Sequence, residues 1–205
     1  METIQKLVTR KGPGHLFRSA HFILALKAID ERGPIGRYEL GRILDLGGGS
    51  IRTLVNRLKD IKLISVEGKK GHILTDDGHK VLKEIKKTVI SIQNLEVAKE
   101  LTNQKFNFGC QARDISNRIG SGIGLRDAAI SIGAKSITSL IYTGDGFIIP
   151  TLGKEYLEKE HPQLSSYLLS KYNFQKGDVL IVCGADTLID AKLGAVTAVF
   201  SLLNE

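Results

Sequence analysis

One short stretch of the chain carries the side-chain types that read the edges of DNA base pairs. Arg52 can donate two hydrogen bonds to guanine, and Asn56 can pair in the same way with adenine. Thr53 can contact a thymine methyl group or a phosphate oxygen. All three fall on one side of the helix that the pattern of residues 51–61 predicts. We therefore expect this side to be exposed and to contact base edges in the major groove.

The other side of that helix is an apolar stripe that must face a core. Its members recur at intervals of three and four residues: Ile51, Leu54, Val55, Leu58 and Ile61. Ser50 follows three glycines and is expected to cap the helix. Arg57 lies at the flank of the polar side. Asp60 would repel phosphate, but it lies at the end of the helix that should already be leaving the groove.

Further cations are placed for contact with phosphate rather than with bases. Lys69 and Lys70 lie in a tight turn, residues 68–71, between two short strands. Arg37 and Arg42 lie on the preceding helix. The predicted DNA-binding residues are Arg37, Arg42, Ser50, Arg52, Thr53, Asn56, Arg57, Lys69 and Lys70.

A glycine-rich segment in the second half of the chain precedes another predicted helix, residues 125–132. Free backbone N–H groups at such a position can hold an anion. Asp127 stands where the dinucleotide-binding pattern has a third glycine, and an acid there would repel a pyrophosphate. A bent connection is the alternative. The candidate ligand-binding residues of this segment are Gly120, Gly122, Gly124 and Arg126.

A second candidate ligand position follows the predicted buried strand 178–183. Gly184 and Asp186 come directly after it, and loops at the carboxyl ends of strands often bind ligands in α/β sheets. The alternative is that Asp186 simply caps the last helix.

Neither a metal site nor catalytic residues are expected. The five histidines have no ligand spacing, and Cys110 and Cys183 lie apart in apolar runs, which fits a reducing cytoplasm. We expect no cofactor. No membrane association is expected either, since no run approaches 18 apolar residues and the polar start lacks a signal-peptide pattern.

The elements that position the first group of residues can be read from periodicity. Residues 16–31, 37–44, 51–61 and 76–87 are predicted helices, the last capped by Thr75. Tyr38, Ile43 and Leu44 are expected to form the apolar face of the second helix. Strands are predicted at 63–67 and 72–74.

This order of elements, with the run from Gly49 to Leu58 and the segment Leu74 to Gly78 after the hairpin, resembles the winged helix-turn-helix of prokaryotic transcriptional regulators. The two-part layout resembles archaeal proteins that join a winged helix to a C-terminal domain of uncharacterised function. The resemblance implies a DNA-binding domain over residues 1–88.

The rest of the chain, residues 89–205, predicts a second domain in which helices and strands alternate imperfectly. The fold class is therefore α+β, a winged helix followed by an α/β sandwich. Strands are expected at 89–92, 105–112, 136–142, 146–149 and 178–183. Helices are expected at 95–101, 125–132, 154–169 and 186–203, and Pro162 could interrupt the third of them.

The two parts of the chain differ in net charge. The chain has a net charge of +7, of which residues 1–88 carry +8 (18 basic, 10 acidic) and residues 89–205 carry −1. A basic domain joined to a neutral one is expected to meet a polyanion. A lysine-rich solvated face is the alternative.

Taken together, these features predict a cytoplasmic regulator that binds double-stranded DNA. The second domain is expected to sense a small-molecule effector or to form a homodimer through its apolar last helix, which its own domain could instead bury. Two alternatives remain open. One is an enzyme in residues 89–205 with an accessory winged helix, and the other is a protein–protein adaptor.

Overall fold

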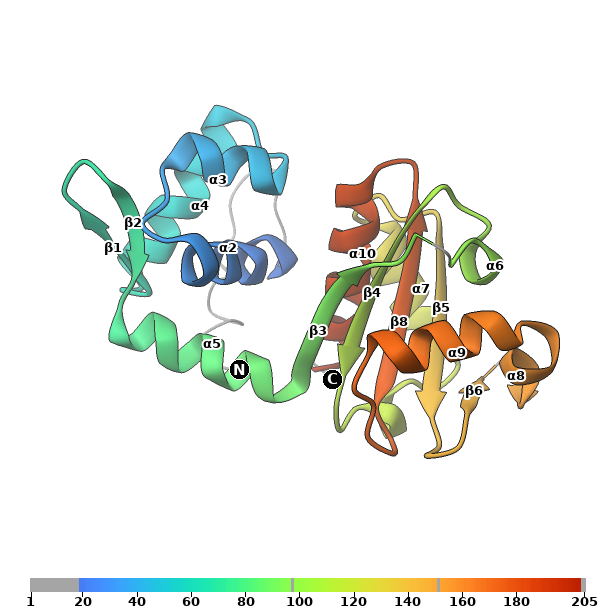
Figure 1. The fold of residues 1–205 in the computed structure, drawn as a ribbon. Coiled ribbons are helices and arrows are strands. Elements are labelled where there is room, and N and C mark those ends of the chain that lie inside the picture. The colour runs from blue at the N-terminus through green and yellow to red at the C-terminus, as the bar shows by residue number, and fades with distance from the viewer. Residues whose placement is uncertain (1–18, 97, 151, 204–205) are drawn as a thin grey trace. The chain divides into compact units, whose positions relative to one another are not determined.

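The computed structural model describes residues 19–96, 98–150 and 152–203, and the chain divides into two compact units between Lys86 and Lys87 (Figure 1). The first unit is mostly helical, and the second combines a six-stranded sheet with helices. The predicted α+β fold class is therefore confirmed. Within the described residues, no helix is both long and apolar enough to cross a membrane.

The first unit has the element order of a winged helix-turn-helix. Its described residues form three helices, followed by a two-stranded antiparallel hairpin and a fourth helix. The elements are α2 (Ser19–Arg32), α3 (Arg37–Leu44), α4 (Gly48–Asp60), β1 (Ile64–Glu67), β2 (Gly71–Leu74) and α5 (Asp76–Thr88). Helix 16–31 was predicted to start three residues before Ser19, at positions outside the described residues.

Helix α4 buries the apolar side that its sequence pattern predicts. Ile51, Leu54, Val55 and Leu58 are all buried, while Ile61 ends the helix half-buried. The predicted cap at Ser50 is wrong. The helix starts earlier, because the Ile51 N–H donates to the Gly47 carbonyl at 3.0 Å and closes a first turn that already contains Ser50.

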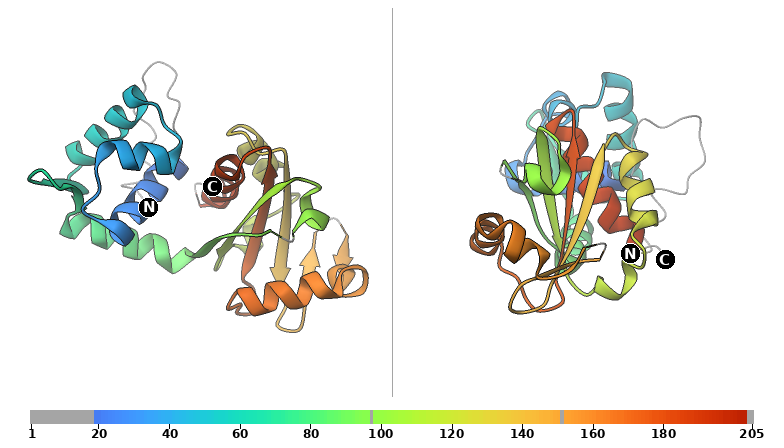
Figure 2. Two further views of the ribbon diagram at one scale, coloured as in Figure 1. Left: turned by 45° about the horizontal axis from the view of Figure 1, so that its top comes forward. Right: turned by 90° about the vertical axis from the view of Figure 1, so that its right-hand side faces the viewer.

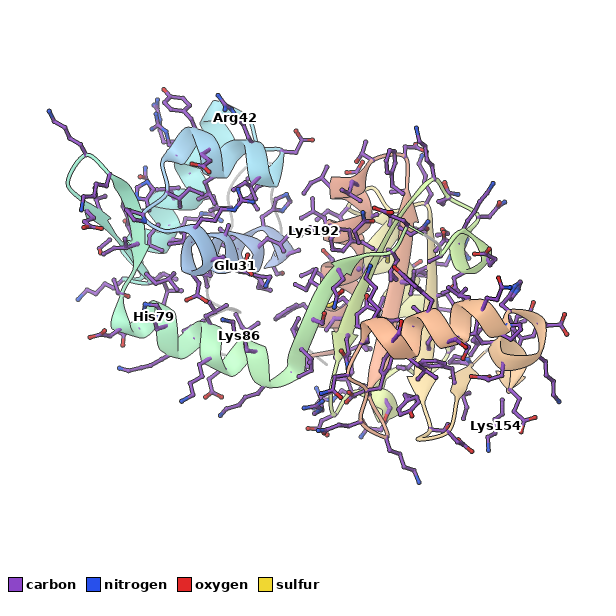
Figure 3. All side chains as sticks on the ribbon, in the orientation of Figure 1. Glu31, Arg42, His79, Lys86, Lys154 and Lys192 are labelled. Atoms are coloured by element: carbon purple, nitrogen blue, oxygen red, sulfur yellow. The ribbon has the colours of Figure 1, made fainter. Side chains whose placement is uncertain are left out.

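Helix α5 begins where predicted and packs on α2. The Gly78 N–H donates to Thr75 Oγ1 at 3.1 Å, so Thr75 caps the helix. Lys86 Nζ lies 2.8 Å from Asp30 Oδ2, and His79 Nδ1 lies 3.5 Å from Asp30 Oδ1. Figure 3 labels Lys86 and His79 on the side of α5 that faces α2.

The second unit is built on one antiparallel sheet with the strand order β3-β4-β8-β5-β6-β7. Every neighbouring pair runs antiparallel. The strands are β3 (Val89–Asn94), β4 (Phe106–Ala112), β5 (Ser136–Tyr142), β6 (Phe147–Ile149), β7 (Gly153–Lys154) and β8 (Val179–Ala185). The central strand β8 is completely buried, which its apolar sequence predicts.

Helices cover both faces of this sheet, so the unit is a three-layer sandwich (Figure 2, right). Consecutive residues of β8 face opposite layers, since Val182 packs with Leu168 of α9 and Cys183 lies against Gly194 of α10. One layer holds α8 (Tyr156–Glu160) and α9 (Pro162–Lys171). The other holds α7 (Ile123–Ile130) and α10 (Leu188–Leu202). Short helices α6 (Lys99–Thr102) and η1 (Ser116–Arg118) lie in the connections.

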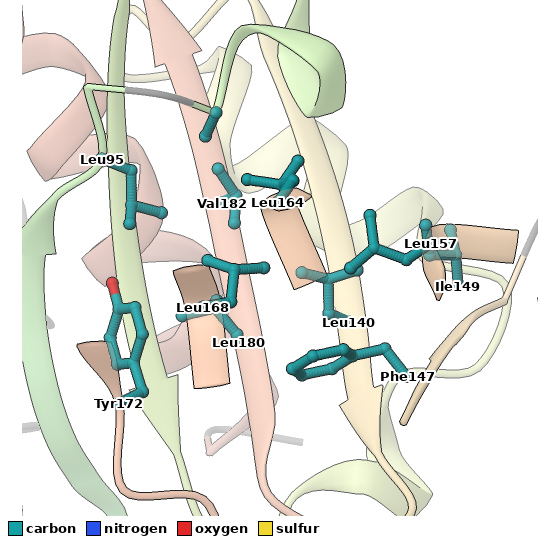
Figure 4. Packing of buried hydrophobic residues seen from close by; sticks show 11 residues of the cluster. Leu95, Leu140, Phe147, Ile149, Leu157, Leu164, Leu168, Tyr172, Leu180 and Val182 are labelled. Atoms are coloured by element: carbon teal, nitrogen blue, oxygen red, sulfur yellow. The ribbon is translucent and has the colours of Figure 1, made fainter. Parts of the chain in front are cut away.

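The core beneath α8 and α9 is rich in leucine and aromatic rings (Figure 4). Its buried members come from three strands and two helices, among them Leu140, Phe147, Leu157, Leu168, Leu180 and Val182. The rings of Tyr142, Phe147 and Phe174 lie with their centroids 5.1–5.5 Å apart. Such tilted contacts add to the free energy gained by burying the rings.

Several predicted boundaries in this unit are wrong for identifiable reasons. Strand 178–183 continues to Ala185, because β4 supplies backbone partners as far as Ala185 and β5 as far as Gly184. The possible interruption at Pro162 is confirmed, because Pro162 starts a new helix and the segment 154–169 forms two helices. Helix 125–132 begins at Ile123, and helix 95–101 is reduced to Lys99–Thr102.

Helix α10 does not present the leftover apolar surface that we expected for dimerisation. Nine of its residues are buried, and it packs against α7 and strands β3, β4 and β8. Leu188 is the large apolar side chain of α10 that remains exposed, at 40%. The alternative, burial of this helix, is the one that the structure supports.

Candidate nucleic-acid interface

The turn between α3 and α4 holds the two helices close together. The Leu46 N–H donates to the Gly41 carbonyl at 2.9 Å, and Asp45 adopts a left-handed conformation with φ 51°. A Cβ on Gly41 would lie 3.1 Å from the Leu46 carbonyl oxygen and 3.5 Å from the Ile51 side chain. A larger residue at this position would therefore push α4 away from α3.

The polar side of α4 is exposed, as its sequence pattern predicts. Arg52, Thr53 and Asn56 are all exposed on the side opposite the buried stripe. The Thr53 hydroxyl donates to the Gly49 carbonyl at 3.1 Å, which leaves its methyl group facing outward. In the described part of the chain, Arg52 and Asn56 have no side-chain partner. Their donors and acceptors are available for a ligand.

Other predicted residues of α4 lie at the margin of this surface. Ser50 and Arg57 are half-buried, and Arg57 already has an interaction within the chain. Asp60 is exposed at the last position of the helix, one full turn beyond Asn56. The acid therefore lies away from the N-terminal residues that would enter a groove.

The hairpin carries two exposed lysines at its tip. Lys70 Nζ lies 3.0 Å from Glu67 Oε1, in a pair that is largely exposed. Such surface pairs contribute little free energy, so a phosphate could replace the carboxylate at low cost. Lys69 is exposed and has no ion pair among the described side chains.

Helix α3 adds a residue that sequence reasoning placed in the core. Tyr38 is 73% exposed, because the buried side of α3 is made by Leu40, Gly41 and Leu44 instead. The Arg37 guanidinium lies over the Tyr38 ring, 5.1 Å from its centroid, and Nη2 lies 3.4 Å from the hydroxyl. The i, i+4 spacing of Leu40 and Leu44 was the available signal that Tyr38 points elsewhere.

Arg37 and Arg42 extend the basic surface along α3. Arg37 is half-buried and Arg42 is exposed, and neither forms an ion pair within the described residues. Figure 3 labels Arg42 on α3, with its side chain at the surface of the first unit. Stacking on Tyr38 holds the Arg37 guanidinium in one orientation, which reduces the entropy lost when it binds a phosphate.

Beneath this surface, His72 of β2 is buried and its Nδ1 has no hydrogen-bond partner. Burial lowers the pKa of His72, and the nearby charges of Lys59 and Arg37 lower it further. The imidazole is therefore neutral at pH 7. Lys59 of α4 and Arg37 of α3 therefore place positive charge close to His72 of the hairpin.

The structure separates the candidate ligand-binding residues of the second unit. Gly122 and Arg126 border a cavity of about 250 Å³ between the start of α7 and strand β5. Gly120 and Gly124 are exposed nearby but do not line it. Of the four candidate residues in the glycine-rich segment, only Gly122 and Arg126 therefore belong to the candidate site.

Gly184 and Asp186 do not form a ligand loop. Gly184 lies within β8, and a Cβ there would come within 2.6 Å of the Gln104 side chain, so glycine is required by packing. Asp186 is exposed and lies 3.4 Å from Lys135 Nζ. The last helix is capped by Thr187, whose Oγ1 accepts from the Asp190 N–H at 3.1 Å. Neither the ligand role nor the expected cap at Asp186 is supported.

The described residues contain no group of three or more metal-binding side chains. Cys110 and Cys183 are both buried, and burial raises the pKa of Cys110 to about 12 and raises that of Cys183 as well. Protonated, inaccessible thiols are poor nucleophiles.

Comparisons with known proteins match both units without assigning an activity. Residues 26–80 match the model of the PH0730-like N-terminal domain, and residues 103–202 match a domain of unknown function, DUF4443. The chain is similar to the solved structure of hypothetical protein PH0730 from Pyrococcus horikoshii OT3, with a TM-score of 0.68 and 22% identity over 90% of this chain and 92% of that one. The comparison with curated proteins found no match. The structural likeness shows a shared fold.

Proposed function

We propose that the chain is a sequence-specific DNA-binding regulator of transcription, in which the first unit binds double-stranded DNA and the second senses a small molecule. The observation that carries this proposal is the pair Arg52 and Asn56 on α4, both exposed and without a side-chain partner in the part of the chain that the structure describes. In a helix-turn-helix, the N-terminal part of the second helix enters the major groove. Arg52 and Asn56 lie four residues apart on that part and match guanine and adenine edges.

The charges around α4 support a polyanionic partner. Residues 1–88 carry a net charge of +8, against −1 for residues 89–205. The cations Arg37, Arg42 and Lys69 form no ion pairs among the described residues. Phosphate contacts from α3 and from the hairpin would fix α4 in register on the duplex, because such contacts position a protein without reading sequence.

We propose further that two copies act together, because a single recognition helix reads only a few base pairs. Two-fold related half-sites about one helical turn apart solve this specificity problem. The proposal rests on that geometry, since α10 offers little exposed apolar surface. Light scattering of the full chain tests it. A monomer at tens of micromolar, with and without DNA, would overturn the dimer.

Competition binding tests the DNA proposal directly. Fluorescence anisotropy measures binding of the full chain to labelled DNA from its own promoter region, in competition with unlabelled promoter DNA or a scrambled duplex. We expect the promoter DNA to compete better by about a hundredfold or more. Arg52→Ala should remove most of that preference. Lys83→Ala removes one exposed charge of the same unit from α5 and should leave the preference unchanged. Equal competition by both duplexes would overturn sequence-specific binding.

A further inference from the structure

The cavity beside α7 brings together three polar side chains that have no partner in the described part of the chain. These are the Arg126 guanidinium and the hydroxyls of Ser121 and Ser139. They come from the segment before α7, from α7 itself and from β5, which are brought together only by the fold. Polar groups that converge on one cavity and do not bond one another are typical of a small-molecule site.

The charge of the cavity favours an anion with a single charge. Among the described residues, Arg126 is the one charged residue in the cavity lining, which includes no carboxylate. Asp127, which was expected to repel a bound anion, lies on α7 but does not line the cavity. Gly122, which also lines the cavity, adopts φ 74° at the N-cap of α7 and supplies no side-chain cap.

The remaining wall is apolar and limits the size of the ligand. Ile119 and Ile149 are buried behind the cavity, Ile137 and Pro150 contribute from the sheet side, and Ile123 is 64% exposed beside it. A volume of about 250 Å³ holds roughly eight groups of the size of water, which take ~30 Å³ each. A free phosphate would fill little of this space and would leave the isoleucines uncovered.

We infer that this cavity binds a small carboxylic acid with a branched or ring-shaped apolar group. The carboxylate accepts from Arg126 and the serine hydroxyls, and the apolar group lies against the isoleucines. In the context of the proposed function, on which this step rests, the acid is the effector of the regulator. The binding of the acid itself depends only on the cavity.

Isothermal titration calorimetry of the full chain tests this assignment. The probes are 3-methylbutanoate, benzoate and phenylacetate, each compared with its neutral amide, and inorganic phosphate. We expect at least one acid to bind at least tenfold more tightly than its amide, because the amide lacks the charge that pairs with Arg126. Failure of all three acids to bind, equal binding of acid and amide, or competition by phosphate at similar concentration would each overturn it.

Two variants separate the charge from the shape of the site. Arg126→Gln should weaken binding of the acid at least tenfold. Ser139→Leu fills the cavity with apolar atoms and should abolish binding while the unfolding temperature is retained. Lys159→Gln removes an exposed charge on α8, in the opposite layer, and should leave binding unchanged. Unaltered binding by both cavity variants would place the acid elsewhere.

DNA binding measured in the same preparation keeps the two proposals distinguishable. If the acid binds and the chain does not bind DNA, the cavity assignment stands and the regulator proposal fails. If the chain binds promoter DNA and none of the acids binds, the cavity assignment fails alone. A change in DNA affinity on addition of the acid would connect the two sites.

Discussion

Two groups of polar side chains, one in each unit, are used in opposite ways. In the first unit, Arg52 and Asn56 are exposed and have no side-chain partner among the described residues. In the second, the polar residues Asn107, Gln111 and Asp178 are at most 1% exposed and are hydrogen-bonded. A polar group that is left unsatisfied at a surface is available to a ligand. One that is satisfied inside a fold specifies how the fold packs.

Asp178 shows the internal arrangement most clearly. Its carboxylate accepts from Arg113 Nε at 3.0 Å, from Gln111 Nε2 at 2.9 Å and from the Gln175 N–H at 2.9 Å. Burial alone would raise the pKa of Asp178, but these donors outweigh it and the pKa lies below its ordinary value. The group joins β4 to the loop that precedes β8, and its role is therefore structural.

The largest loss of stability should come from removing the Asp178 carboxylate. Asp178→Ala leaves Arg113 and Gln111 without their acceptor, so we expect unfolding of the second unit to become easier by about 3–5 kcal/mol. Urea denaturation followed by circular dichroism measures this loss. Asp186→Ala removes an exposed carboxylate from the same unit and should cost less than about 0.5 kcal/mol. Similar losses for both variants would contradict the contrast between internal and surface polar groups.

The exposed residues should behave in the opposite way. Asn56→Ala should reduce discrimination at one base pair by about 1–3 kcal/mol and leave the free energy of unfolding unchanged, because the side chain contacts only solvent. Anisotropy with single-base variants of the promoter measures the first quantity, and urea denaturation measures the second. A loss of stability above about 2 kcal/mol would place Asn56 in the core and refute the orientation of α4.

The hairpin should affect binding without affecting sequence preference. Replacing Lys69 and Lys70 with alanine removes two phosphate contacts, so affinity should fall about equally for all duplexes. The slope of log affinity against log salt should become shallower by roughly one to two units. An altered sequence preference with an unchanged slope would mean that the hairpin reads bases.

The smallest effect concerns pH and distinguishes the units by their buried titratable groups. The pKa of His72 is lowered from 6.5, so the unfolded chain takes up the proton first as the pH falls. His72 therefore contributes stability that is complete above about pH 6.5 and decreases below it. The lowered pKa of Asp178 acts in a different window, because its contribution is complete above about pH 3.8 and is lost as the pH falls further.

As the pH falls from 7.5 to 4.5, the unfolding temperature of the first unit should therefore decrease before that of the second. His72→Gln should remove the part of this dependence that arises in the first unit. A pH dependence of equal size in that variant would assign the effect to another group.

Local patterns predicted most of the elements, because periodicity reports which side of a helix or strand is buried. The stripe from Ile51 to Leu58 is the clearest case. Strand 105–112 was also predicted, although its residues 107–112 are buried on both sides of the sheet. Caps were less predictable, since Ser50 and Asp186 both lie near a helix start that another residue determines. Only the folded backbone shows which carbonyl closes the first turn.

The parts of the candidate sites that sequence did not reveal depend on long-range packing. Tyr38 looked like a core residue, and only the position of Leu40 and Leu44 against α4 shows that it is exposed. The cavity needs α7, β5 and Ile149 to meet, and nothing local to the glycine-rich segment indicates an apolar wall. Arg126 could be singled out from the sequence, but its lack of an acidic neighbour in three dimensions could not.

The salt dependence of DNA binding by the full chain tests the central claim most directly. In the proposed complex, Arg37, Arg42, Lys69 and Lys70 would provide about four phosphate contacts in each copy. Anisotropy between 50 and 300 mM salt should therefore give a log–log slope of about −3.5 or steeper, with each contact contributing about −0.9. No binding at any salt concentration, or a slope near zero, would contradict the claim that the exposed side of the first unit is a DNA-binding surface.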